Sequence, residues 1–145
     1  MPENPSYKCN PSRPVPIMII FGDEDPLVPF NGGDISILGL SKRGKVIPVK
    51  ESVNYWVSFN GCRTTPTISQ IDNADDDTKA IKNDYLSDNS SKKNNSEVIF
   101  WLIKGGGHTW PGGLQYLPEA IIGRTSQQIN ASEEIWKFFE DKTLN

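Results

Sequence analysis

The chain contains few of the residues that would indicate several common kinds of site. Its 145 residues include one histidine and two cysteines, so count and spacing exclude a zinc site of the C-x-x-C type. Fifteen Lys and Arg stand against 18 Asp and Glu, for a net charge of −3, and no basic stripe with interleaved aromatic residues is present. The sequence therefore gives no indication of a nucleic-acid-binding protein.

Long apolar runs are also missing. No stretch approaches the roughly 20 residues that a membrane-spanning helix needs, so no membrane span is expected. Residues 1–14, MPENPSYKCNPSRP, lack the charged-then-apolar layout of a signal peptide. The chain does have four Trp, six Phe and four Tyr, which are enough to anchor a packed core. A chain of this length is normally one domain, and we expect a single, mildly acidic globular one.

Apolar patterning predicts an alternation of strands and helices, which is typical of an α/β layer structure. Residues 22–50 read as loop. A helix is predicted from Ser52, as its cap, to about Asn60, with Gly61 as its stop. The expected strands are 15–21 (VPIMIIF), 65–72, 79–86 and 97–104, the second and third forming a hairpin around the acidic turn Asp72–Asp77.

The last segment, INASEEIWKFFEDK, carries the clearest helix signal in the chain. Asn130 is expected to cap this helix, and Glu133 occupies the capping-box position. Ile135, Phe138 and Phe139 recur at helical spacing, so they are predicted to form its buried stripe.

Carboxylates and the single histidine follow the two most apolar strands. The stretch FGDEDPLVPFNGG places Asp23 and Asp25 just after the first strand, and WLIKGGGHTWPGG places His108 just after the last. Open α/β sheets carry their chemistry at the carboxyl ends of strands. If the two strands are parallel neighbours, Asp25 can accept the Nδ1–H of His108 and leave Nε2 to take a proton from a nucleophile.

Each of these residues also has a simpler interpretation. Asp25 taken alone fits a turn former, because Asp favours such loops. His108 taken alone fits a surface histidine on a flexible turn. Their joint placement favours the catalytic interpretation.

The stretches PVPIMIIFGDEDPLVPFNGG, SVNYWVSFNGC and IKGGGHTWPGG, in that order, resemble the polyhydroxybutyrate depolymerase and feruloyl esterase branch of the α/β-hydrolase superfamily. The resemblance runs from about Cys9 to the final helix. It implies that Asp25 is the triad acid, that His108 is the base, and that Trp110 lines the substrate pocket. A packing role for Trp110 is compatible with this. Asp23 stands where that family has a small or uncharged residue, and is expected to be a solvated neighbour.

The nucleophile elbow of that family, G-x-S-x-G, is absent from this sequence. Ser36 and Ser126 each follow a glycine by three residues, which is the wrong spacing. Because the triad order in these hydrolases is Ser, Asp, His, residues 1–145 are interpreted as the C-terminal portion of a single α/β-hydrolase domain. Its mostly parallel sheet would be flanked by helices, and its nucleophile-bearing half would lie upstream.

The resemblance implies a serine-type carboxylic ester hydrolase without cofactor or metal. Its substrate would be a polyester, such as a polyhydroxyalkanoate, or a polysaccharide bearing feruloyl or acetyl groups. The upstream half of the same domain would be its partner. The full-length protein is expected to be secreted or periplasmic.

Three points stay open at the level of sequence. Cys9 and Cys62 fit a disulfide or two thiols equally well. The acidic stretches Asp23–Asp25 and Asp72–Asp77 allow a calcium-stabilised module, although neither has EF-hand spacing. A non-catalytic polymer- or polysaccharide-binding module would use the four tryptophans, Trp56, Trp101, Trp110 and Trp136.

Overall fold

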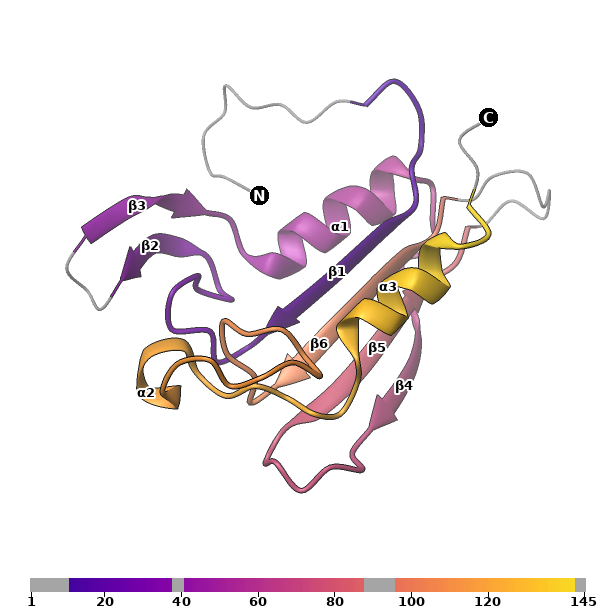
Figure 1. The fold of residues 1–145 in the computed structure, drawn as a ribbon. Helices are drawn as coiled ribbons and strands as arrows, with labels where there is room; N and C mark the ends of the chain where they lie inside the picture. Colours follow the sequence, from indigo (N-terminus) through magenta and orange to yellow (C-terminus); the bar gives the residue numbers. More distant parts are fainter. Residues whose placement is uncertain (1–10, 38–40, 88–95, 143–145) are drawn as a thin grey trace.

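A computed structural model of the protein describes residues 11–37, 41–87 and 96–142 (Figure 1). The described chain combines strands and helices and is therefore an α/β structure. In chain order its elements are β1 (Ile17–Gly22), β2 (Gly33–Ile37), β3 (Ser41–Val46), α1 (Val49–Phe59), β4 (Thr67–Ile71), β5 (Lys79–Tyr85), β6 (Val98–Lys104), α2 (Glu119–Ile122) and α3 (Ala131–Phe139).

The main sheet has four strands in the order β1-β6-β5-β4. β1 and β6 are parallel neighbours, paired from Ile17 with Val98 to Gly22 with Ile103. β5 runs antiparallel to both β6 and β4. The sheet is therefore mixed, and the expectation of a mostly parallel sheet is wrong for the described residues. A short turn joins β4 to β5, and short turns connect antiparallel strands only.

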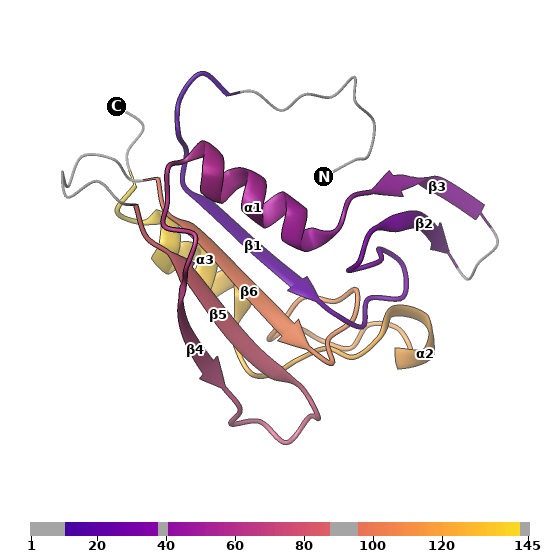
Figure 2. The same cartoon turned by 180° about the vertical axis from the view of Figure 1, so that it is seen from behind.

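Helices cover both faces of this sheet (Figure 2). Ile17, Ile19 and Phe21 of β1 pack into the cluster that contains the buried residues of α1. Met18 and Ile20 pack on the opposite side, into the cluster that contains Phe138 of α3. This alternation explains why β1 is apolar at every position: it lies between two layers, although Ile17 to Phe21 are only half-buried at the edge of the described sheet.

The two longer helices begin in different ways. α1 starts after Pro48, a residue with fixed φ that suits the position before a helix, so the predicted cap at Ser52 is wrong. Ser52 instead lies buried inside the first turn of α1. The predicted cap of α3 is confirmed, because the Asn130 side chain accepts a hydrogen bond from the Glu133 backbone N–H at 3.2 Å.

The buried stripe of α3 is narrower than predicted. Phe138 is buried and its ring stacks edge-on against Phe139, with centroids 4.6 Å apart. Phe139 itself is exposed, and so is Trp136. Of the three predicted stripe residues, Phe138 is therefore buried, Ile135 is half-buried and Phe139 is exposed.

Residues 22–50 are not simply loop. β2 and β3 form an antiparallel hairpin with a bulge between Asp34 and Ser36. The sequences GDISI and SKRGKV contain too few apolar residues to show the two-residue alternation of a strand with one buried face. Figure 1 shows this hairpin projecting outward beyond β1, the strand at one edge of the main sheet.

Cys62 is buried after α1, with its Sγ 3.1 Å from the Ser96 carbonyl oxygen. Cys9 lies outside the described residues, so a pairing between the two cysteines stays open. Within the described ranges, no helix has the length and apolar character needed to cross a membrane.

Candidate active site

The loop after β1 holds Asp25 rigidly. One carboxylate oxygen, Oδ1, accepts hydrogen bonds from the backbone N–H groups of Leu27 and Val28, each at 2.8 Å. These are the bonds of an Asx turn, and Pro26 lies inside that turn. Only 5% of the Asp25 side chain is exposed. Its second oxygen, Oδ2, is aimed away from the loop and is available to another group.

The loop after β6 holds His108 by its backbone. The His108 N–H donates to the Ile122 carbonyl at 2.6 Å, and the Gly107 N–H donates to the Arg124 carbonyl at 2.9 Å. A Cβ on Gly107 would lie 2.2 Å from the Ile122 oxygen, so a side chain there is incompatible with this approach. The glycines before His108 therefore let the segment around residues 122–124 lie directly against it.

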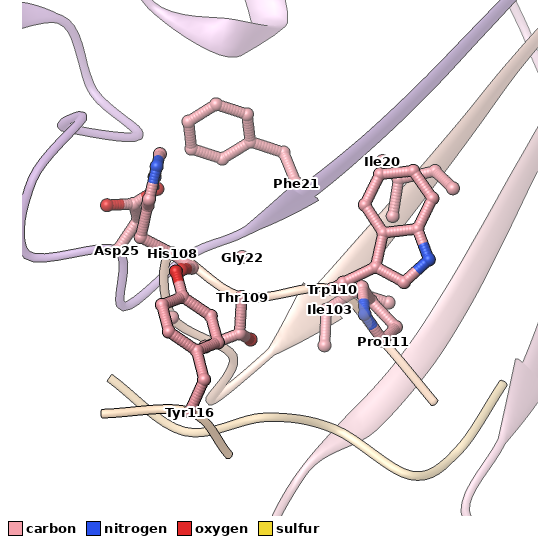
Figure 3. A pocket seen from close by; sticks show the side chains of 11 residues that line it. Ile20, Phe21, Gly22, Asp25, Ile103, His108, Thr109, Trp110, Pro111 and Tyr116 are labelled. Carbon is pink, nitrogen blue, oxygen red and sulfur yellow. The ribbon is translucent and has the colours of Figure 1, made fainter. Parts of the chain in front are cut away.

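Asp25 and His108 meet at the edge of the sheet where β1 and β6 end (Figure 3). The distance from Asp25 Oδ2 to His108 Nδ1 is 2.8 Å, which agrees with the contact expected from parallel neighbouring strands. With a carboxylate as partner, Nδ1 is assigned as the protonated nitrogen and Nε2 as the free one. Because 47% of the His108 side chain is exposed, the ring is accessible while the acid beneath it is not.

Asp23 differs from its expected role as a solvated neighbour. Its Oδ1 accepts a hydrogen bond from the Gly105 backbone N–H at 2.7 Å. The Asp23 N–H donates in turn to the Ile103 carbonyl at 3.2 Å, which continues the β1–β6 pairing past the end of β1. Asp23 therefore connects the acid-bearing loop to the turn that leads to His108.

A cavity of about 340 Å³ opens beside the pair, within the size range of small-molecule sites. Its lining includes Trp110, which the family resemblance implied as a pocket residue, and also Tyr116, which was not singled out from the sequence. The Trp110 indole N–H donates to the Ser132 hydroxyl at 3.1 Å, at the start of α3. The complete lining is Ile20, Phe21, Gly22, Asp25, Ile103, Gly107, His108, Thr109, Trp110, Pro111 and Tyr116.

The two serines with near-elbow spacing do not compensate for the missing nucleophile. Ser126 is completely buried, and its hydroxyl is hydrogen-bonded to the Thr78 hydroxyl at 2.6 Å, so it is inaccessible to a substrate. Ser36 lies within β2, at the hairpin bulge, rather than on a strand-to-helix turn.

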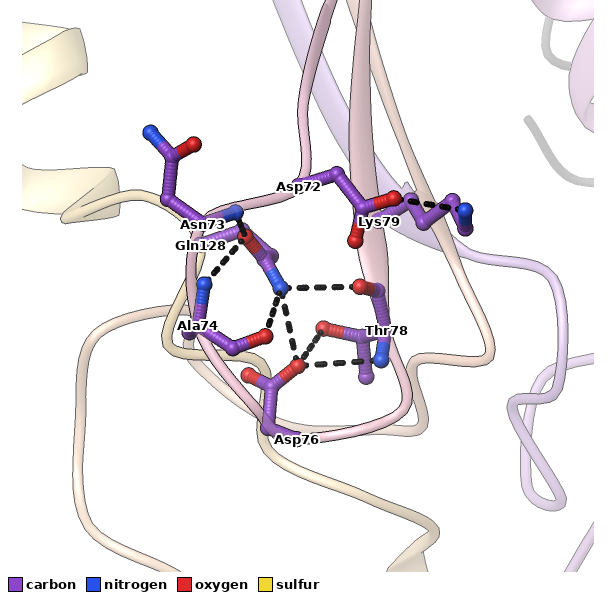
Figure 4. Close-up of polar contacts among 7 residues, drawn as sticks. All are labelled: Asp72, Asn73, Ala74, Asp76, Thr78, Lys79 and Gln128. Carbon is purple, nitrogen blue, oxygen red and sulfur yellow. Dashed lines mark hydrogen bonds and ion pairs between the residues drawn. The ribbon is translucent and has the colours of Figure 1, made fainter.

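The acidic turn before β5 uses its central carboxylate for internal hydrogen bonds (Figure 4). Asp76 Oδ1 accepts from the Thr78 backbone and hydroxyl and from the Gln128 amide, at 2.7 to 3.0 Å. Burial raises the pKa of Asp76, but these bonds and one from the Gln127 backbone outweigh burial and hold it below its usual value. Within the described ranges, no three His, Cys, Asp or Glu side chains are grouped to hold a metal ion.

The four tryptophans do not share a surface. Trp101 is buried in the core on the α3 side of the sheet, and Trp56 packs against the core on the α1 side. Trp110 and Trp136 are exposed. A flat binding face built from all four rings is therefore absent.

Comparison with known proteins shows a distant relationship to esterases. The chain is 26% identical over 136 residues to "Putative esterase NocK" of Nocardia uniformis subsp. tsuyamanensis, a match that covers 90% of this chain and 38% of that protein. It is 31% identical over 101 residues to "Feruloyl esterase B" of Piromyces equi, covering 70% of this chain and 17% of that protein. The chain thus spans well under half the length of either relative.

No protein-family model matches the chain, and no solved structure matches it. The two relatives support an esterase-like relationship at this level of identity. Together with the α/β fold and the Asp25–His108 contact, they make ester hydrolysis the activity to test.

Proposed function

We propose that this chain supplies the acid and the base of a serine-type carboxylic ester hydrolase. The observation that carries the proposal is the 2.8 Å contact between Asp25 and His108 beside an open cavity. A buried carboxylate that orients an exposed imidazole is the arrangement that prepares a histidine to accept a proton from a hydroxyl nucleophile. The esterase names of the relatives agree with this chemistry.

In the proposed mechanism, His108 acts twice. Its Nε2 first takes the proton from a serine hydroxyl as that oxygen attacks the ester carbonyl, and then gives the proton to the leaving alcohol. Water then cleaves the resulting acyl-enzyme: His108 deprotonates the attacking water and returns the proton to the serine oxygen as its bond to the acyl group breaks. Asp25 stays ionised throughout, fixes the tautomer of the ring and stabilises the imidazolium that forms at each step.

The serine belongs, in this proposal, to a segment upstream of residue 1 within the same hydrolase domain. β1 supports this interpretation, because it lies at one edge of the described sheet although its residues are apolar on both faces. An open apolar edge of that kind favours further pairing. We also assign the protein to the polyhydroxybutyrate depolymerase and feruloyl esterase branch, with a polyester or acylated polysaccharide as substrate and a secreted or periplasmic location.

The experiment compares residues 1–145 with a longer chain extended upstream through a G-x-S-x-G sequence. The short chain is expected to be poorly soluble, to bind hydrophobic dyes and to resist labelling by a fluorophosphonate probe. The longer chain is expected to gain solubility, probe labelling and hydrolysis of an aryl ester together, and to lose hydrolysis in His108→Ala.

One result would overturn the proposal directly. If residues 1–145 alone were monomeric, unfolded cooperatively and hydrolysed an aryl ester through His108, the nucleophile would have to lie within this chain. Ser36→Ala and Ser126→Ala would then be the first variants to measure.

A further inference from the structure

Tyr116 contacts the backbone of the candidate base. Its hydroxyl donates to the His108 carbonyl oxygen at 3.2 Å, while its ring lines the cavity beside the imidazole. Figure 3 shows the ring rising from the segment after the GHTWPGG turn, with its hydroxyl toward His108. The ring is 61% exposed, so it stands at the mouth of the cavity rather than in the core.

The loop that carries Tyr116 is fixed by its neighbour Gln115. The Gln115 amide nitrogen donates to the carbonyls of Leu117 and Gly123, at 2.7 and 3.0 Å. Its amide oxygen accepts from the Thr125 N–H at 2.8 Å. One side chain thus joins the Tyr116 loop to the segment that also bonds the His108 backbone, and both residues are held against the same support.

Trp110 provides a second aromatic wall of the same cavity. Its polar edge is bonded to Ser132, and the polar edge of Tyr116 is bonded to the His108 carbonyl. With both polar edges occupied, the carbon faces of the rings are left to contact a ligand. Aromatic faces held in this way bind apolar or flat groups at a low cost in conformational entropy.

The charge of the residues that line the cavity further limits the class of ligand. Among the lining residues none is a lysine or an arginine, and the buried Asp25 carboxylate is the one acidic group. The nearby Arg124 is directed elsewhere, 3.5 Å from the carboxylates of Asp77 and Glu119. A substituent carrying a carboxylate would meet a negative charge and no lysine or arginine in this cavity.

We infer that Tyr116 is a specificity-determining residue, which selects a neutral, apolar substituent of the ester in the cavity it shares with Trp110. This inference rests on the proposed function and deepens it. Tyr116 contacts the substituent and not the reacting atoms, so its contribution is to the choice between esters. The missing methylenes of a shorter substituent reduce the contact area with its ring, which is how an apolar pocket ranks a homologous series.

The test uses the longer chain that carries the serine segment, with para-nitrophenyl acetate, butyrate and hemisuccinate as substrates. With Tyr116 unchanged, the longer chain is expected to have a higher kcat/KM for the butyrate ester than for the anionic hemisuccinate. Tyr116→Ala is expected to lower the ratio of kcat/KM for butyrate to that for acetate by about tenfold, mainly through KM. Tyr116→Phe keeps the ring and is expected to keep this ratio.

The matched control is Leu114→Ala in the same loop. Leu114 is 88% exposed and does not line the cavity, so this variant is expected to leave the ratio unchanged. Tyr116→Arg adds a cation and is expected to raise the relative kcat/KM for hemisuccinate. It keeps the test decisive if the alanine variant folds poorly.

Equal losses for all three esters in Tyr116→Ala, or no change in any ratio while His108→Ala abolishes hydrolysis, would overturn the assignment of Tyr116. The proposed ester hydrolase function is tested separately, by the His108 variant. If His108→Ala left hydrolysis intact, the proposed function itself would fail, whatever the Tyr116 variants showed.

Discussion

The Asp23 carboxylate accepts a hydrogen bond from the Gly105 N–H at 2.7 Å, and so joins the two loops that carry Asp25 and His108. A backbone bond from Glu24 to the Gly106 carbonyl, at 3.0 Å, adds to the connection. The relative position of acid and base is therefore fixed by contacts just outside the sheet as well as by the β1–β6 pairing.

Asp25→Asn tests the orienting role of the acid. The amide favours the wrong imidazole tautomer, so kcat/KM of the longer chain is expected to fall on the order of 10⁴-fold with the fold intact. Asp23→Asn is the matched control, because its amide oxygen still accepts from Gly105, and it is expected to retain most of the activity. A loss of only a few-fold in Asp25→Asn would assign the orientation of His108 to another group.

The pH dependence of hydrolysis tests the base. His108 accepts a proton only in its neutral form, so kcat/KM is expected to rise from acid to neutral pH. The measurement is a pH profile of aryl-ester hydrolysis by the longer chain between about pH 5 and 8. A flat profile over this range would contradict the role of His108 as general base.

Asp76 is expected to support folding more at neutral than at acid pH. Its pKa in the folded chain lies below the unfolded value, because hydrogen bonds outweigh burial. The stabilisation is therefore present above the unfolded pKa and is lost as the pH falls through the folded pKa. Asp76→Asn is expected to lower the free energy of unfolding by about 1 kcal/mol near neutral pH, discounted for partial exposure.

Denaturant unfolding of the longer chain as a function of pH measures this effect. The exposed neighbour Asp75→Asn serves as the control and is expected to change stability little at any pH. A stability difference for Asp76→Asn that stayed constant on acidification would show that the charge of Asp76 is not involved.

The Asp84 carboxylate is expected to destabilise the folded chain at neutral pH, which is the opposite of the effect expected for Asp76. Burial raises the pKa of this carboxyl, with Glu97 adding to the shift and Lys82 and Lys142 opposing it, and its Oδ1 has no hydrogen-bond partner among the described residues. A folded pKa above the unfolded one means that stability falls as the pH rises through the folded pKa. Asp84→Asn is therefore expected to raise the free energy of unfolding at neutral pH, with the gain shrinking in acid.

Thermal unfolding of the longer chain carrying Asp84→Asn, at neutral and acid pH, is the relevant measurement. Asp72→Asn is a suitable control in the same hairpin, because Asp72 is exposed and its ion pair with Lys79 is a surface one. A lower melting temperature for Asp84→Asn at neutral pH would contradict the prediction.

Gly107→Ala tests the close approach behind the base. The new Cβ would lie 2.2 Å from the Ile122 oxygen, so the segment around residue 122 must move and weaken its bond to the His108 N–H. We expect a loss of about 1–3 kcal/mol in the free energy of unfolding, as for overpacked sites. Gly61→Asn is the control, since its positive φ suits Asn and nothing lies within 4 Å of its Cβ position.

The sequence predicted those parts of the fold whose signals are local. The apolar runs that became β1 and β6, and the cap at Asn130, depend on neighbouring residues and were found in the expected places. The β2–β3 hairpin was missed because the two isoleucines of β2 are too short an apolar pattern to indicate a strand, and β3 has only one apolar side chain. The mixed sheet was missed because the expectation of a mostly parallel one came from the resemblance and not from the residues.

The candidate site also has a part that could be predicted from the sequence and a part that could not. The contact between Asp25 and His108 followed from two strand ends, provided that the strands were parallel neighbours. Tyr116 could not be found by such reasoning, because its position depends on the bonds of Gln115 to residues 117–125. The role of Asp23 was likewise missed, because the Gly105 N–H from which it accepts a hydrogen bond lies 82 positions away in the chain.

The same distance along the chain has a consequence for folding kinetics. Asp25 and His108 are separated by 83 positions, and the pairing of β1 with β6 closes a loop that contains β2, β3, α1, β4 and β5. Pairings of such high contact order close long loops and are slow to form, while the β4–β5 turn closes quickly. The nuclear magnetic resonance signal of the Nδ1 proton should therefore appear last during refolding, which makes this single histidine an internal reporter of the completed native state.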